Sequence, residues 1–479
     1  MIDSLHTRMT NPLRESTTMK TTRSFVLSAA AMMLVLPAAA QQGTGNPDTS
    51  VAAPQPVATA PAKAKRSRGD MAAPIVLQNV RPQDQRGLAI FEPPKEDTVT
   101  YTGFRLSWGA AFTQQFQDLS HETTADSRLV NGVEQNRLMA IGAGFNNATA
   151  NLNLGAQLAP GIRVALTSYL SSRHHNETWV KDGYLLVDQS PWEQAQLKKV
   201  MELVTLKLGH FEVNYGDAHF RRTDNGNAIY NPFVGNLILD AFTTEIGGEV
   251  YARHEGWMGM VGVTGGEIRG NVTRPDDRSL AFIGKLGFDR QLTEAVRVRL
   301  TGSTFQQAKA ISNTLYAGDR AGSRYYFVLE NDLATESANF RSGMINPGFS
   351  SKIVAYMVNP FVKYQGFELF GTLEHAEGRG ATEPESRTIH QQAIEGLYRF
   401  AADDQLYVGA RYNRVWGELA GIPNEIETDR FLVGGGWFIT PGVLMKAEWV
   451  TQKYNDFPTT DIRSGGKFNG FVVEGVVAF

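Results

Sequence analysis

The sequence predicts an all-β fold, a transmembrane antiparallel β-barrel of about sixteen strands. Three observations indicate it. Apolar and polar side chains alternate in many segments between residues 102 and 479, the connections between these segments differ widely in length, and the chain ends on an aromatic residue, Phe479. Alternation with period two puts the apolar residues of each strand on one face. A content of 42% hydrophobic and 20% charged residues is compatible with a membrane barrel, because half of each strand is polar.

The composition excludes several other classes of protein. The 479 residues contain no cysteine, which excludes disulfide scaffolds, thiolate zinc sites and iron–sulfur clusters. The 46 basic and 49 acidic residues give a net charge of -3, so a nucleic-acid partner is not expected. Beyond the N-terminus, no apolar run approaches the roughly 18 residues of a membrane helix. No motif for a cofactor occurs, and none is expected to bind.

The N-terminus has the pattern of an export signal. A short basic stretch is followed by an apolar run and by three alanines that end at Ala40. This order predicts a secretory signal peptide over residues 1–40, with Met19 as the better initiator. Residues 41–69 are rich in Ala and Pro and predict a disordered linker, because they cannot bury enough apolar area to offset chain entropy. Residues 70–101 are expected to form an extended periplasmic lead-in.

The strands follow one another in a regular series, of which the last is the clearest. Phe471, Val473 and Val477 fall on one face of this segment, and Glu474 falls on the other. In a soluble sandwich the apolar faces would turn inward, whereas in an outer-membrane barrel they meet lipid. The expected strands are 102–119, 145–157, 162–173, 177–188, 201–212, 243–254, 257–266, 278–289, 295–307, 351–364, 367–378, 388–401, 405–418, 428–439, 443–455 and 467–479.

Each strand is justified by side chains of opposite character on its two faces. In chain order, clear sets are Leu152 and Leu154 against Asn151 and Asn153, Val164 and Leu166 against Arg163, Phe282 and Leu286 against Lys285, Val296 and Val298 against Arg297, Phe431 and Val433 against Arg430, and Met445 and Ala447 against Lys446. Two segments fit less well. Asp182 interrupts the alternation of 177–188, and Pro360 favours a bulge or an edge in 351–364. Residues 323–330 could add a strand within a loop, and residues 191–200 could form a short periplasmic helix.

The connections favour the membrane barrel over the sandwich. Short turns are expected at sites such as Pro160-Gly161 and Pro441-Gly442, and the longest connections are 120–144, 213–242 and 308–350. Outer-membrane barrels have short periplasmic turns and longer outer loops. With sixteen strands, both ends of the barrel lie on the periplasmic side.

The connection 213–242 is the third on the long-loop side and is rich in charge. Paired arginines, two aspartates and a histidine are suited to screening small ions. The alternative interpretation is a solvated surface loop. The residues are Asp217, His219, Arg221, Arg222 and Asp224.

The signal peptide, the strand series, the long third loop and the terminal Phe together resemble a Gram-negative outer-membrane porin. Residues 207–211, Lys-Leu-Gly-His-Phe, lead into Tyr215 and Gly216 and are similar to the phosphate-selective porin group. The resemblance implies that the third loop folds inward, where its five charged residues would form a pore constriction. It also implies a homotrimer.

In that group, lumen arginines and lysines guide anions, and this chain carries basic residues on the predicted inward faces. They are Arg105, Arg163, Lys207, Lys285, Arg297, Arg299, Arg411, Arg430 and Lys446. Glutamates are expected on the same faces, and they limit the expected selectivity to a mild preference for anions, phosphate-like anions among them. They are Glu245, Glu249, Glu368, Glu374, Glu395, Glu448 and Glu474.

The predicted function is a passive diffusion channel for small hydrophilic solutes, surrounded by lipid in a Gram-negative outer membrane. The alternative is a structural or adhesive barrel with a plugged lumen. An enzyme is not expected, since the chain has no Gly-x-Ser-x-Gly elbow and no phosphate-binding loop. The adjacent His174 and His175 lack the spacing of a helical zinc motif. A barrel hydrolase with a Ser–His pair on its lipid-facing wall is the remaining enzymatic alternative.

Overall fold

The computed structural model describes residues 81–92, 95, 101–146, 148–172, 178–266, 272–317, 324–336 and 341–479. The predicted signal peptide and linker, most of the lead-in, and the pair His174 and His175 lie outside the described residues.

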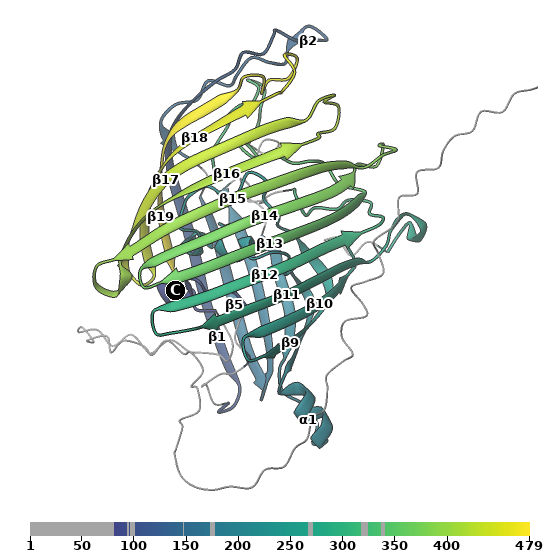
Figure 1. Ribbon diagram of the computed structural model, residues 1–479, viewed down its shortest axis with the longest axis vertical. Helices are drawn as coiled ribbons and strands as arrows, with labels where there is room; N and C mark the ends of the chain where they lie inside the picture. Colours follow the sequence, from purple (N-terminus) through teal and green to yellow (C-terminus); the bar gives the residue numbers. More distant parts are fainter. Residues whose placement is uncertain are drawn as a thin grey trace, which may run out of the picture. The chain divides into compact units, whose positions relative to one another are not determined.

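Sixteen antiparallel strands of the described chain close into a barrel (Figure 1), which confirms the predicted fold class. Each strand pairs with its neighbours in sequence, and β1 pairs with β19 to close the ring. The strands are β1 (Arg105–Glu122), β5 (Thr149–Ala159), β6 (Ile162–Ser171), β7 (Trp179–Val187), β8 (Val204–Glu212), β9 (Thr244–His254), β10 (Trp257–Thr264), β11 (Ala281–Gln291), β12 (Val296–Gln307), β13 (Lys352–Tyr364), β14 (Phe367–Arg379), β15 (Arg387–Phe400), β16 (Leu406–Gly417), β17 (Ile426–Thr440), β18 (Val443–Asn455) and β19 (Lys467–Ala478).

The two ends of the barrel differ as the connection lengths predict. One end carries short turns, together with α1 (Ala195–Met201), close to the helix expected at 191–200. The other end carries the long loops, with the small strands β2 (Leu129–Val130) and β3 (Val133–Glu134) and, paired to β1, β4 (Gly144–Phe145). Figure 1 shows α1 and β2 at opposite ends. The 3-10 helices are η1 (Gln85–Gly87), η3 (Ala218–Arg221), η4 (Ala228–Tyr230), η5 (Pro275–Asp277) and η6 (Ala402–Asp404).

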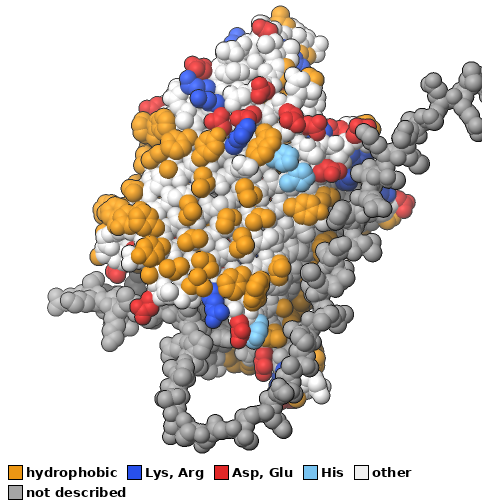
Figure 2. Space-filling model, viewed as in Figure 1, with side chains coloured by type: hydrophobic (Ala, Val, Ile, Leu, Met, Phe, Trp, Pro, Cys, Tyr) orange, Lys and Arg blue, Asp and Glu red, His pale blue; other side chains and the backbone are white. Residues whose placement is uncertain are grey.

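The alternation of each strand separates an apolar outer face from an inner face that carries the charges. In β19, Phe471 is 60% exposed, whereas Glu474 is fully buried on the inner side. Figure 2 shows the outer face as a field of hydrophobic side chains, with charged and histidine side chains gathered above and below it. No helix among the described residues is long and apolar enough to cross a membrane.

Two details of the predicted strands are wrong. Residues 324–330 form turns and not a strand, because Phe327 and Leu329 have positive φ angles of 57° and 54°, which an extended strand does not allow. Pro360 pairs with Leu300 of β12, and the ladder between β13 and β14 omits Asn359 and Pro360 without a shift of register, so the proline lies at neither a bulge nor an edge. The side-chain amide of Asn359 donates to Gly371 O at 3.0 Å, and so supplies a hydrogen bond beside the proline, which has no N–H.

Asp182 does mark an irregularity. The ladder between β6 and β7 shifts register at Thr167 and Ser168, so that Lys181 lies in a bulge. The bulge turns Lys181 inward, where it is buried and forms an ion pair with Asp224. A bulge re-aims a side chain in this way because one residue is left out of the pairing.

We predict that a charge on the outer face destabilises the barrel according to its position along the strand. Leu286 lies in the middle of β11 and is 62% exposed, so Leu286→Arg should lower the free energy of unfolding in lipid vesicles by about 2–4 kcal/mol. Leu292 lies just beyond the end of β11 and is 54% exposed, so the control Leu292→Arg should cost about 0–1 kcal/mol. Equal effects in urea unfolding would contradict the assigned outer face.

Candidate functional site

Residues 213–243, which connect β8 to β9, lie inside the barrel. Phe233, Ile238 and Leu239 are at most 1% exposed, and η3 and η4 are the only helical turns in this stretch of the described chain. Asparagine, aspartate and glycine allow the tight turns that fold the loop back on itself. Asn225, for example, takes a left-handed φ of 50° and donates to the side chain of Asn151 on β5 at 2.8 Å.

The barrel wall supplies hydrogen-bond partners for the backbone of this loop. Lys446 of β18 donates to three of its carbonyls, those of Ala228, Asn231 and Phe233, at 2.9, 3.0 and 2.7 Å. Glu448, two residues along the same strand, accepts from Val234 N at 2.8 Å. Backbone groups without a sheet or helix partner need such bonds when they are buried. Polar side chains of β18 therefore hold this part of the loop.

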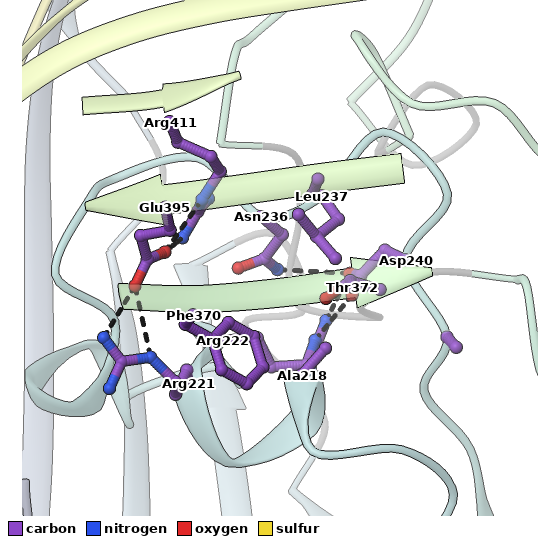
Figure 3. Close-up of a pocket in the computed structure, with 12 residues that line it drawn as sticks. Ala218, Arg221, Arg222, Asn236, Leu237, Asp240, Phe370, Thr372, Glu395 and Arg411 are labelled. Atoms are coloured by element: carbon purple, nitrogen blue, oxygen red, sulfur yellow. Dashed lines mark hydrogen bonds and ion pairs between the residues drawn. The ribbon is translucent and has the colours of Figure 1, made fainter. Parts of the chain in front are cut away.

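The two arginines predicted for a constriction lie in this loop and are paired with carboxylates (Figure 3). Arg221 contacts Glu395 of β15 at 2.6 Å. It also contacts Glu368 of β14 at 3.3 Å. The other oxygen of Glu395 accepts from Arg411 of β16 at 2.6 Å. Glu395 thus links the loop to two strands of the wall.

Arg222 is bound within the loop itself. Its guanidinium donates to both oxygens of Asp240, at 2.8 and 2.6 Å, a bidentate pair. Asn236 donates to the same carboxylate at 3.1 Å. Asp240 lies near the end of the same loop but is not among the five residues predicted for the constriction.

Asp217 lies nearer the short-turn end, in a second cluster. It contacts Lys285 of β11 and Arg299 of β12, each at 2.7 Å. Burial alone would raise the pKa of Asp217, but these two cations lower it below its usual value. Glu92, from the segment before the barrel, binds the same Lys285 and Arg299 at 2.8 and 2.6 Å.

The other two predicted loop residues contact groups on the neighbouring strands and loop. His219 Nδ1 lies 2.8 Å from Glu212 at the end of β8, and its Nε2 lies 3.1 Å from Asn214 Oδ1. Asp224 forms its ion pair with Lys181 of β7. The structure thus brings all five predicted loop residues into the barrel, but into several separate clusters.

The predicted basic residues of the wall lie on inward faces, and their side chains have partners. Arg163 contacts Asp188 at 2.7 Å, Lys207 contacts Glu249 at 3.3 Å, and Arg297 contacts Asp289 at 2.7 Å. Arg430 donates to the carbonyls of Asn236 and Gly343. Arg105, at the beginning of β1, is half-buried and donates to Thr102 Oγ1.

A small cavity lies between part of the loop and the wall. A cavity of about 20 Å³ is lined by residues of the loop, such as Arg222 and Asp240, and by wall residues such as Glu395 and Arg411 (Figure 3). This is room for about one water molecule. Among the described residues, no group of three or more His, Asp or Glu side chains is placed to hold a metal ion.

Sequence reasoning missed three residues that complete these clusters: Glu92, Lys181 and Asp240. Lys181 points inward only because of the bulge, which strict alternation does not predict. Glu92 precedes the first strand, where no periodic pattern indicates a partner. Asp240 could have been found, since it lies in the charged loop that the sequence analysis singled out.

We predict that Lys446 is a main anchor of the loop. It is buried, forms an ion pair with Glu474 at 2.7 Å and binds three loop carbonyls, so Lys446→Met should lower the free energy of unfolding by about 3–5 kcal/mol. Lys467, which pairs with Glu122 on the surface, is the control, and Lys467→Met should cost below about 1 kcal/mol. Hydrogen exchange at residues 228–235 should rise only in the first variant, and unchanged exchange there would contradict the anchoring role.

Comparisons with known proteins find similar solved structures. No family model and no curated protein match the chain. Similar solved structures include an anion-selective porin from Comamonas acidovorans (10% identity, 78% of this chain and 100% of that one, TM-score 0.48), the outer membrane channel DcaP of Acinetobacter baumannii (9%, 79% and 99%, 0.46) and OprB of Pseudomonas putida (11%, 79% and 94%, 0.44). By its own strands, apolar outer face and inward third loop, the chain has the architecture of a sixteen-stranded transmembrane β-barrel.

Proposed function

We propose that the chain is an outer-membrane channel for small hydrophilic solutes, with residues 213–243 as the element that controls passage. The observation that carries this proposal is the lumen itself, in which ionised side chains of the wall face an inserted loop. An apolar outer face and a charged inner face suit a barrel that separates lipid from a polar path. In this proposal the long loops face the exterior of the cell and the short turns face the periplasm.

In this proposal the loop narrows the path, and passage of a solute requires the loop to shift. A cavity of about 20 Å³ is too small for a solute larger than water. The contacts that hold the loop, such as Arg221 with Glu395 and Arg411 with Gly235 O, are polar. Water can replace such contacts as the loop moves, and the opening of a packed element of this kind takes microseconds to seconds.

A second candidate function is favoured by the same packing. If the loop never moves, the barrel is a structural or adhesive protein with a plugged lumen, and its long loops bind a partner. The full burial of Phe233, Ile238 and Leu239 inside the barrel supports this candidate.

Electrical conductance separates the two candidates. We expect purified protein in a planar lipid bilayer to give stepwise openings, because each channel adds a unit of current when its loop moves aside. Silence over a range of voltages would leave only the plugged barrel.

We further propose that the open channel mildly prefers anions and that Arg221 and Arg222 contribute to this preference. Arg221→Ala with Arg222→Ala would remove arginine partners from the carboxylates of Glu368, Glu395 and Asp240, and so make the lumen more negative. The permeability ratio should therefore shift toward cations, by up to about an order of magnitude at low salt, since the potential in a narrow path concentrates ions of one sign. Reversal potentials in a salt gradient measure this shift.

Arg414 provides the matched control for that experiment. It pairs with Glu427 on the outer face of β16 and is 43% exposed, so Arg414→Ala should leave the reversal potential unchanged. A cation preference in the unmodified protein would contradict the proposed anion preference.

We also propose a homotrimer in a Gram-negative outer membrane. Light scattering of the detergent-solubilised protein, corrected for bound detergent, should give three chain masses, and a single chain mass would contradict the trimer.

A further inference from the structure

The segment before the barrel, residues 81–92, lies in the short-turn mouth of the lumen. Gln85 N donates to Pro441 O at 2.8 Å, and the side chain of Gln85 donates to Asp403 O at 2.7 Å. Both acceptors belong to short turns, those between β17 and β18 and between β15 and β16. The segment therefore reaches across the rim of the barrel and touches turns that are distant in sequence.

An aromatic anchor holds the far end of this segment. Phe91 is 2% exposed, and its ring centroid lies 5.3 Å from that of Phe361 on β13 and 6.5 Å from that of Phe370 on β14. It also lies 5.9 Å, edge to face, from Phe220 of the inserted loop. A single side chain of the segment thus contacts both the wall and the loop.

A charged anchor stands next to it. Glu92 shares Lys285 and Arg299 with Asp217 of the loop, so one carboxylate from the segment and one from the loop neutralise the same two wall cations. Burial opposes ionisation of Glu92, but the two cations hold its pKa well below the usual value. The carboxylate occupies the position that a mobile anion would otherwise take between these cations.

A third anchor joins the segment to the loop directly. The guanidinium of Arg81 lies 3.6 Å from the ring centroid of Tyr230 and donates to Phe220 O at 3.0 Å. The hydroxyl of Tyr230 in turn donates to Pro82 O at 2.8 Å. Burial lowers the pKa of Arg81 to about 10, and the side chain stays cationic at neutral pH.

We propose that residues 81–92 form an intramolecular plug that closes the short-turn mouth and latches residues 213–243 in the lumen. This proposal rests on the proposed channel function and adds its regulation. The plug adds no strand to the sheet, so it can leave without breaking a strand ladder. Residues 93–104 join the segment to β1 and span up to roughly 40 Å when fully extended.

The test weakens two anchors at once. Phe91→Ala with Glu92→Gln removes the aromatic contact and the shared charge, and it should raise the ratio of open to closed time in a planar bilayer by about tenfold. Arg86→Ala is the control, because Arg86 lies in the same segment, is 59% exposed and binds Asp84 of its own turn. Circular dichroism of both variants checks that the barrel has folded.

A locked form tests the same inference in the opposite direction. The chain has no cysteine, so Gln85→Cys with Asp403→Cys introduces the only thiols, at two positions in hydrogen-bond contact. Joining them with a short bismaleimide should hold the plug in place and suppress openings, whereas each single-cysteine variant should open like the unmodified protein.

The outcomes separate the plug from the channel function. If the unmodified protein opens, and neither Phe91→Ala with Glu92→Gln nor the crosslink changes its openings, the plug is overturned and the channel function stands. Free conductance by the crosslinked protein would also overturn the plug. Silence of every variant would overturn the channel function and, with it, the plug that rests on it.

Discussion

A loop enclosed by a barrel has no neighbouring strand for its backbone, and every buried N–H and C=O that it brings must find another partner. In this chain the wall provides these partners through long polar side chains. Lys446 donates to three carbonyls, Glu448 accepts from a backbone N–H, and Gln391 bonds both the N–H and the C=O of Leu239. This requirement alone is a reason for the inward positions of the strands to be polar.

The same requirement shapes the electrostatics of the lumen. Charges of the wall are neutralised by charges of the loop and of the preceding segment, as with Lys285, Arg299, Asp217 and Glu92. A count of basic and acidic side chains on the strands therefore describes the field only when the loop is absent. Any movement of the loop exposes wall charge and changes the field together with the width of the path.

The strands and their faces could be predicted because period-two alternation is a local property that each segment displays separately. All sixteen segments and the inward position of residues such as Lys285 and Arg411 follow from it. The partners inside the lumen could not be predicted, because they depend on contacts between distant parts of the chain. Lys181 turns inward at a bulge, residues 324–330 dock through Tyr325 and Glu448 without forming a strand, and Glu92 comes from a segment with no periodic pattern.

The seam between β1 and β19 has a consequence for how the barrel assembles. Gln115 and Glu474, bonded at 2.7 Å across it, are 359 residues apart, whereas the other ladders join strands that follow one another. Bringing together two strands so far apart in sequence is slow, because the entropy of loop closure is lost before the contacts between the strands form. Until β19 reaches β1, the growing sheet has two unpaired edges, which are sites of aggregation. The chain is therefore most exposed to aggregation while it is an open sheet, before the ring has closed.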